Sequence, residues 1–311
     1  MVTAVRTPST AAPTGCYGFS VQSPFRLHYL REGGLERLEL LEAAAPEPEE
    51  GILIYEWTPT PGHVLHARLY QDGARYRFWV EGMGTFLIDP AGLRITVPPL
   101  GDAIHREERL WGWPTILCFL QRGDFAMHAA SADVDGAGIV LGAPGRFGKT
   151  TLATALHLAG YRVLSEDLSC LRSATLLSVV PGPAMLRIRQ DVMRGLNLQG
   201  GHVVREDSER CSVAITPDRR GTCDPVPLRA VVLLRESPDG IRIERVPFRA
   251  ALPDLWSLSF HLPNPDSRAR CFSAVVDVAR YVSVWNVYRP LTHEDLPETV
   301  DRIVRDCLGK T

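Results

Sequence analysis

The sequence predicts a protein of the α/β (α+β) class, in which a β-rich N-terminal part precedes a mixed sheet with helices. Residues 52–97 contain short runs with the alternation and the bulky side chains of half-buried strands. The pair Pro98-Pro99 then interrupts this pattern and marks a boundary. Beyond the boundary, the apolar run 138–141 leads through a loop that contains glycine into the helical pattern 151–159, which is a strand–loop–helix unit.

Composition excludes several classes of protein. The chain has 311 residues, of which 45% are hydrophobic, and a net charge of -2, which fits a soluble globular protein. This charge gives no reason to expect nucleic acid or an anionic membrane as a partner, and no apolar run is long enough to span a membrane. The seven cysteines form no C-x-x-C pair, which favours a reduced, cytoplasmic chain and argues against structural zinc.

We divide the chain into three parts. Residues 1–16 are rich in Thr, Ala and Pro and lack the apolar core of a secretory signal, so we predict a disordered tail. Residues 17–100 are the β-rich N-terminal domain, which could dock a substrate. Residues 101–311 are the α/β domain that contains the strand–loop–helix unit.

Turn signals place the strands of the N-terminal domain. The run Val64–Tyr70 alternates, and Asp72-Gly73 joins it to the bulky run Arg75–Val80, which predicts a hairpin. A second turn joins residues 85–89 to residues 93–97. This pattern is typical of a meander.

The α/β domain alternates between predicted strands and helices. Residues 102–121 have helical spacing, which Pro114 should kink or divide. A strand is expected at 126–134, and Asp135-Gly136 turns it into the strand before the loop. We predict a mobile loop in the charged segment 202–210. Further strands are predicted at 161–164, 168–171, 177–180, 185–188, 213–215, 227–234 and 241–243, and helices at 248–260, 267–282 and 296–307.

The loop between the strand and the helix is predicted to bind the phosphates of a nucleotide. Backbone N–H groups and the helix dipole favour an anion at such a place. Lys149 would reach the outer phosphates, and the Thr150 hydroxyl would ligate Mg²⁺. The predicted nucleotide-binding residues are Gly142, Ala143, Pro144, Gly145, Arg146, Phe147, Gly148, Lys149, Thr150 and Thr151.

One position departs from the usual pattern of a phosphate loop. That pattern has glycine five residues before Gly148, where this chain has Ala143, and the glycine stands one place earlier, at Gly142. Alanine still permits a tight turn if its φ is negative. The alternative is an ordinary turn between a strand and a helix, although it leaves Lys149 unexplained.

A second feature is the acidic pair Glu166-Asp167, directly after the apolar run 161–164. The separation from Lys149 accommodates a helix and a strand, so the acids should return to the sheet edge that carries the loop. One carboxylate would hold Mg²⁺, and the other would accept a proton from an attacking hydroxyl. The alternative is that the pair caps a turn.

Three further side chains are candidates for the site. His128 lies on the strand next to the loop strand, from which its ring could approach the terminal phosphate, although a structural histidine is the alternative. Arg187 and Arg189 alternate on a predicted strand and would share a face. They could bind phosphate or carboxylate groups of a substrate, or simply be solvated.

Together these residues resemble the catalytic domain of the HPr serine kinase/phosphorylase family. The resemblance covers residues 126–172, with Met127-His128-Ala129-Ala130-Ser131 before the loop, Gly148-Lys149-Thr150-Thr151 within it, and Gly160 to Leu168 around the acidic pair. The core of this family is similar to that of phosphoenolpyruvate carboxykinases. The resemblance therefore implies a P-loop core of this type, with a mixed sheet, for residues 101–311.

The resemblance also implies ATP and Mg²⁺ as cofactors and roles for the site residues. Lys149 would hold the β- and γ-phosphates, and Thr150 and Asp167 would ligate Mg²⁺. Glu166 would be the base that acts on the acceptor hydroxyl, with His128 adjacent. The family usually has two aspartates, so the glutamate leaves the division of roles within the pair open.

The N-terminal domain differs from that of the HPr enzymes, so the chain looks closer to divergent HPr-kinase-like proteins from peptide-tailoring gene sets, including lasso-peptide kinases. That resemblance implies a kinase whose acceptor is a serine or another hydroxyl of a peptide or protein. It is also compatible with a homo-oligomer, because the family often forms multimers. Two alternatives stay open, namely a kinase of a small metabolite and a nucleotide-sensing regulator without turnover.

Overall fold

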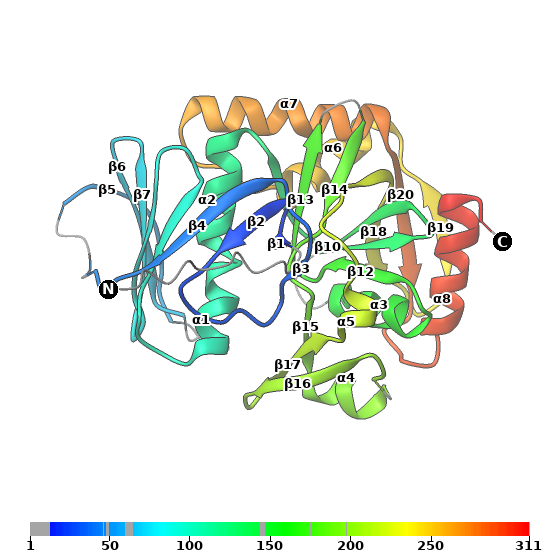
Figure 1. Ribbon diagram of the computed structural model, residues 1–311. Coiled ribbons are helices and arrows are strands. Elements are labelled where there is room, and N and C mark those ends of the chain that lie inside the picture. The colour runs from blue at the N-terminus through cyan, green and yellow to red at the C-terminus, as the bar shows by residue number, and fades with distance from the viewer. Residues whose placement is uncertain are drawn as a thin grey trace.

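The computed structural model describes residues 13–45, 47, 50–59, 65–143, 147–173, 176–196 and 198–310. Over these residues the chain is a mixed α/β protein, rich in strands, with a nine-stranded, an eight-stranded and a three-stranded sheet. The nine-stranded sheet forms one side of the molecule, and the eight-stranded sheet with its helices forms the other (Figure 1).

The nine-stranded sheet is built from the N-terminal third of the chain. Its strands are β1 (Thr14–Cys16), β2 (Phe19–Gln22), β3 (Arg31–Glu32), β4 (Glu36–Glu42), β5 (Ile52–Trp57), β6 (Ala67–Asp72), β7 (Arg75–Val80), β8 (Gly84–Ile88) and β9 (Arg94–Val97). Their order across the sheet is β3-β1-β2-β4-β9-β8-β7-β6-β5. The predicted meander is confirmed from β5 to β9, including the hairpin in which Asp72 pairs with Arg75. By contrast, β4 runs parallel to both of its neighbours.

The predicted disordered tail is too long. Residues 14–16 were assigned to it, but they form β1, which pairs with β2 and β3. Cys16 is fully buried, so backbone pairing and burial of its side chain together hold this segment in the sheet. Residues 1–12 of the predicted tail lie outside the described residues.

Two helices follow the first sheet. α1 (Ala103–Leu110) and α2 (Trp113–Arg122) take the place of the single helical pattern, which breaks at Gly112. Pro114 therefore lies in the first turn of α2, where its missing N–H group would have no helical partner in any case. The prediction that proline divides this segment is confirmed.

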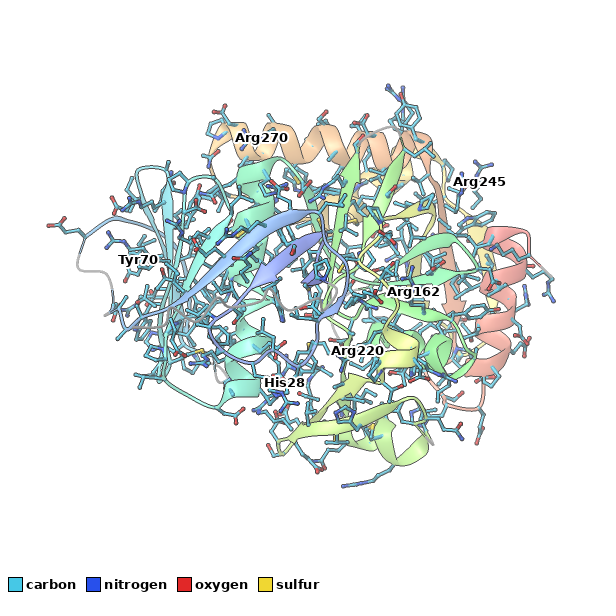
Figure 2. The ribbon with its side chains drawn as sticks, in the orientation of Figure 1. His28, Tyr70, Arg162, Arg220, Arg245 and Arg270 are labelled. Atoms are coloured by element: carbon cyan, nitrogen blue, oxygen red, sulfur yellow. The ribbon has the colours of Figure 1, made fainter. Side chains whose placement is uncertain are left out.

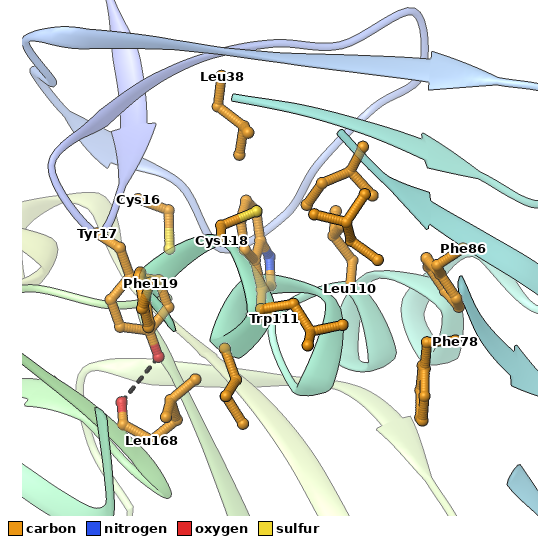
Figure 3. Packing of buried hydrophobic residues seen from close by; sticks show 14 of the residues in the cluster. Cys16, Tyr17, Leu38, Phe78, Phe86, Leu110, Trp111, Cys118, Phe119 and Leu168 are labelled. Atoms are coloured by element: carbon orange, nitrogen blue, oxygen red, sulfur yellow. Dashed lines mark hydrogen bonds between the residues drawn. The ribbon is translucent and has the colours of Figure 1, made fainter. Parts of the chain in front are cut away.

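The core of the first sheet extends across the predicted domain boundary. It joins Phe86 of the sheet and Leu110 of α1 to Leu168, which lies much later in the chain (Figure 3). The Tyr17 hydroxyl also donates a hydrogen bond to the Leu168 carbonyl oxygen (2.8 Å). Residues on the two sides of position 100 thus share one hydrophobic core.

The eight-stranded sheet contains the strand–loop–helix unit. Its strands are β10 (Phe125–Val134), β11 (Ala137–Gly142), β12 (Arg162–Ser165), β13 (Leu168–Ser173), β14 (Leu177–Val180), β18 (Val226–Glu236), β19 (Arg242–Arg245) and β20 (Ser283–Arg289). Strands β11, β18 and β20 are parallel, so their carboxyl ends meet at one edge of the sheet. Both β11 and β12 are antiparallel to β10, which brings Ser165, the end of β12, to the same edge.

Helices pack on both faces of this sheet. α3 (Lys149–Leu158) and α8 (Leu296–Arg302), which the π-helix η1 (Ile303–Cys307) continues, pack against the face that includes Leu141. α6 (Phe248–Leu258) and α7 (Pro265–Tyr281) pack against the face that includes Val140. Successive side chains of β11 therefore enter different layers, as expected for a strand buried on both faces.

The three-stranded sheet corrects one prediction. Its strands are β15 (Met185–Arg189), β16 (Gly201–Glu206) and β17 (Arg210–Ile215), with the short helices α4 (Gln190–Gly195) and α5 (Pro217–Arg220) nearby. Residues 202–210 were expected to be a mobile loop, but most of them form β16, which pairs with β17. The physical reason is that β17 is almost entirely buried and needs a partner for its backbone groups.

All seven cysteines lie within the described residues, where each is buried and unpaired. Burial raises the pKa of the Cys118 thiol well above its ordinary value, so this side chain stays protonated. In the described part of the chain, no helix has both the length and the apolar character needed to cross a membrane.

Candidate functional site

The candidate site lies where β11 ends and α3 begins. Gly148 caps α3 with a φ of 81°, a left-handed conformation that favours glycine. Lys149, Thr150 and Thr151 form the first turn of the helix, whose N–H groups favour an anion because they have no helical partner. Three predicted nucleotide-binding residues lie outside the described part of the chain, namely Pro144, Gly145 and Arg146.

Packing explains why glycine stands at position 142 and alanine at 143. A Cβ atom on Gly142 would lie 2.4 Å from Cδ1 of Leu258 in α6, which is closer than two carbon atoms can approach. The side chain of Ala143 instead belongs to the core on the opposite face of the sheet, together with the partly buried Phe147. A side chain at position 142 would therefore require Leu258 to move, whereas the small side chain of Ala143 fits into the core.

Lys149 and Thr150 face the acidic pair. The side chain of Lys149 is buried, with Nζ 3.4 Å from the carbonyl oxygen of Ala143. Burial lowers the pKa of Lys149, although the negative charges of Asp167 and Glu166 oppose this effect. The Thr150 hydroxyl donates a hydrogen bond to Oε1 of Glu166. The first turn of α3 and the acidic pair are thus in direct contact.

Glu166 and Asp167 are adjacent in the chain but occupy different environments. Glu166 is 5% exposed, whereas the side chain of Asp167 is 63% exposed. Burial and the charge of Asp167 raise the pKa of Glu166 to about 7, against the hydrogen bond from Thr150. Partial desolvation raises the pKa of Asp167, but the hydrogen bond and charge of His128 outweigh it and hold that pKa at about 2.

His128 joins the acidic pair from β10. It is the exposed residue of a strand whose other side chains are buried or half-buried, and it pairs in register with Leu168, next to Asp167. Its Nε2 lies 3.0 Å from Oδ1 of Asp167, and its ring stacks on Phe260 with 6.3 Å between centroids. Thr150 thus contacts Glu166, and His128 contacts Asp167, so each member of the acidic pair has one polar partner here.

The two predicted substrate arginines separate in space. Arg187 is half-buried, and its positive charge acts on the pKa of both Glu166 and Asp167. Arg189 is exposed, and its guanidinium pairs with Asp191 at 3.0 Å. Of the two, Arg187 is therefore the one that faces the acidic pair.

The sequence analysis missed Arg289, the last residue of β20. Its side chain is 2% exposed, and its Nη2 would lie 2.4 Å from a Cβ atom on Gly148, so the guanidinium packs against the start of α3. Nη1 donates to the carbonyl oxygen of Pro290 (2.9 Å), whereas the buried Nε finds no acceptor among the residues that the structure describes. The available signal was its place at the carboxyl end of a strand parallel to β11.

A cleft of about 310 Å³ opens beside the site. Its lining includes His128, Gly142 and Ala143 as well as Arg235 and Asp254. These last two side chains form an ion pair at 2.5 Å. Sequence patterns did not single them out, because neither belongs to a recognisable motif.

Comparison with known proteins adds a weak structural similarity. No family model and no curated protein matches the sequence. The HPr(Ser) kinase/phosphatase from Coxiella burnetii matches in structure with a TM-score of 0.32 and 12% identity, over 58% of this chain and 94% of that one. A similarity at this level does not assign the chain to a family, so a functional proposal has to rest on the site.

Proposed function

We propose that this protein is a kinase that uses ATP and Mg²⁺ to phosphorylate a hydroxyl group of a peptide or protein. The proposal rests on the contact between the first turn of α3 and the acidic pair. Thr150 donates a hydrogen bond to Glu166, and His128 contacts the neighbouring Asp167. Binding of a nucleotide alone can use one carboxylate to hold Mg²⁺ but needs no base. Phosphoryl transfer needs both metal ligands and a group that receives the hydroxyl proton.

The phosphates of ATP would bind at the start of α3. Lys149 supplies one positive charge there, and Arg289 supplies a second, because its guanidinium packs against Gly148. Among the described residues Arg289 forms no ion pair with a carboxylate, and burying a guanidinium in this way is costly in the free protein. A phosphate anion at the loop would provide that partner.

The oxygen atoms at the start of α3 fit Mg²⁺. The Thr150 hydroxyl and the Glu166 carboxylate are hydrogen-bonded to each other, and both are the hard oxygen ligands that Mg²⁺ prefers. Burial and the charge of Asp167 raise the pKa of Glu166, and a cation bound there would oppose both effects. When bound, Mg²⁺ would neutralise charge on the phosphates.

The contacts favour a division of roles that differs from the one implied by the resemblance. Glu166 is buried against Thr150, the expected metal ligand, whereas Asp167 is exposed and oriented by His128. We therefore assign the metal to Glu166 and proton acceptance to Asp167. The acceptor oxygen would attack the γ-phosphorus, the bond to the β–γ bridging oxygen would break, and the hydroxyl proton would pass to Asp167.

The cleft beside His128 is the proposed entrance for the acceptor. A volume of about 310 Å³ suits a small group, such as one hydroxyl-bearing side chain of a peptide. Ribosomally made peptides such as lasso-peptide precursors are the first acceptors to test. The same volume also suits a polar metabolite, whose charges the Arg235–Asp254 pair could bind, so a metabolite kinase is the second candidate.

Transfer of phosphate by the purified protein tests the proposal. With ATP and Mg²⁺, the wild-type protein should add the mass of one phosphate to a peptide encoded near its gene, as measured by mass spectrometry. Lys149→Ala should lower ATP turnover at least about a hundredfold while leaving the circular dichroism spectrum unchanged. Labelling of a hydroxylated metabolite instead of a peptide would favour the second candidate. Equal turnover in both proteins would contradict the assignment of the loop.

A further inference from the structure

Four arginines gather where α1 meets the three-stranded sheet. Arg109 belongs to α1, Arg187 to β15, Arg205 to β16 and Arg210 to β17. Arg187 and Arg205 pair with Glu108 of α1, Arg210 donates to the carbonyl oxygen of Arg187, and the charges of Arg187 and Arg205 act on the pKa of Arg109. We call these four residues the arginine cluster. Figure 2 shows this part of the molecule around His28, which contacts α1.

The arginine cluster carries more positive than negative charge. Glu108 of α1 lies 3.2 Å from Arg205 and 3.8 Å from Arg187, and Asp207 lies 3.5 Å from Arg205. The other two arginines form no ion pair with any described residue. Within the described residues, the four guanidinium groups thus have two carboxylates at ion-pair distance, and Nη1 of Arg210 donates instead to the carbonyl oxygen of Arg187 (3.2 Å).

The cluster is also partly removed from water. The side chain of Glu108 is 4% exposed, and those of Arg187 and Arg205 are 33% and 24% exposed. The buried Nε atom of Arg187, which lies 3.8 Å from Glu108, makes no hydrogen bond within the part of the chain that the structure describes, and Arg109 donates to a neutral partner, His105 Nε2, at 3.1 Å. Burial and the charge of Arg187 lower the pKa of Arg109. Such crowding of like charges is unfavourable unless an anion binds.

The cluster lies close to the acidic pair. β15 packs against α3, the helix that begins at Lys149. The charges of Arg187 and Arg210 also act on the pKa of Glu166. A chain whose hydroxyl is at Asp167 would therefore reach the cluster within a few residues.

We propose that the arginine cluster binds acidic side chains of the acceptor, so that the protein selects a hydroxyl flanked by Asp or Glu. This inference rests on the proposed function. Guanidinium groups bind carboxylates through paired, charge-assisted hydrogen bonds. Because α1 shares the core of the nine-stranded sheet, the N-terminal third of the chain would take part in docking the acceptor.

Fluorescence anisotropy without nucleotide tests this inference directly. The probes are a labelled serine peptide with two glutamates on each side and its glutamine counterpart. The acidic peptide should bind about tenfold more tightly at low salt, and added salt should reduce this difference. Equal binding of the two peptides would overturn the inference.

Single substitutions assign the effect to the cluster. Arg187→Gln and Arg205→Gln should each weaken binding of the acidic peptide about tenfold, the loss expected for one charge-assisted hydrogen bond. Arg189→Gln is the matched control, because Arg189 lies on the same strand as Arg187 but pairs with Asp191. Its affinity for the acidic peptide should stay unchanged, and an equal loss in the control would contradict the assignment.

Glu108→Gln separates binding from a purely structural role. If the cluster binds anions, removal of its own carboxylate should strengthen binding of the acidic peptide. If the arginines serve only to hold α1 against the sheet, the same change should lower the melting temperature and weaken or leave unchanged the binding.

The arginine cluster could instead bind the phosphates of the nucleotide, which are the other anions at this site. A fluorescent ATP analogue should bind the wild type and Arg205→Gln with similar affinity if the cluster serves the acceptor. A tenfold loss of nucleotide affinity in Arg205→Gln, without loss of peptide affinity, would assign the cluster to ATP and overturn the inference. Failure of the wild type to bind the nucleotide would instead contradict the proposed function, while the peptide result stands by itself.

Discussion

At the scale of single residues, Glu166 and Asp167 illustrate how adjacent side chains acquire different properties. The sequence places both carboxylates directly after a buried strand. In the folded chain, Glu166 turns inward to Thr150, while Asp167 turns outward to His128. Burial raises the pKa of the first carboxyl group, and the histidine lowers the pKa of the second. Which carboxylate meets the metal therefore depends on the direction of each side chain.

Glu166→Gln should stabilise the protein at alkaline pH when EDTA is present. The folded-state pKa of Glu166, about 7, lies above its ordinary value of 4.5, so folding favours the protonated form. Stability therefore falls as pH rises from about 4.5 to about 7, by on the order of 1–3 kcal/mol. Glutamine cannot ionise, so the variant should not lose this stability as the pH rises. Urea unfolding should show the variant to be more stable than the wild type at pH 8 and equally stable at pH 4.5, and an equal difference at both values would contradict the burial argument.

Arg289→Met should affect stability and ATP binding in opposite directions. Methionine fills a similar volume without the buried charge, so the free protein should gain about 1 kcal/mol of stability. The affinity for a fluorescent ATP analogue should fall about tenfold, because a phosphate partner is lost. Arg245→Met is the control, since Arg245 is exposed on β19 (Figure 2). If both variants bind the analogue like the wild type, Arg289 does not contact phosphate.

At the scale of elements, local sequence patterns predicted the hairpins, the division at Pro114 and the strand–loop–helix unit, because these depend on turn residues and on periodicity. The strand β16 was missed because it lies in a segment, residues 202–210, that is mostly polar and charged. It forms because β17 is buried and offers backbone groups for pairing. The glycine at 142 was visible in the sequence, but its reason was not, because Leu258 comes from a distant helix.

At the scale of the whole molecule, the N-terminal part supports the strand that carries the acidic pair. Arg31 of β3 is 1% exposed, and its guanidinium donates to the carbonyl oxygens of Val163 (2.8 Å), Leu164 (3.1 Å) and Gly182 (2.7 Å). The first two of these residues belong to β12, just before Glu166. The sequence suggested two domains divided near position 100, but these contacts and the shared core join the two parts.

Arg31→Met should therefore destabilise the entire molecule. The change removes a buried donor from several carbonyl oxygens, of which that of Leu164 keeps the backbone N–H of Gly182, and it should lower the free energy of unfolding by about 2–4 kcal/mol. Arg37→Met is the control, because the side chain of Arg37 is 62% exposed and pairs only with Glu39 in the described residues. Urea unfolding would measure both variants. A loss below about 0.5 kcal/mol in Arg31→Met would show that the two parts are energetically independent.

By itself, the sequence determined most of the strands and helices, the place of the candidate phosphate loop and the carboxylates that follow it, since these depend on local periodicity and on residue type. Only the tertiary structure decided that Glu166 meets Thr150, that His128 meets Asp167, and that Arg289 and the arginine cluster lie beside them. The physical reason is that such contacts join residues far apart in the chain. Their distances depend on how the sheets pack, and no short segment encodes that packing.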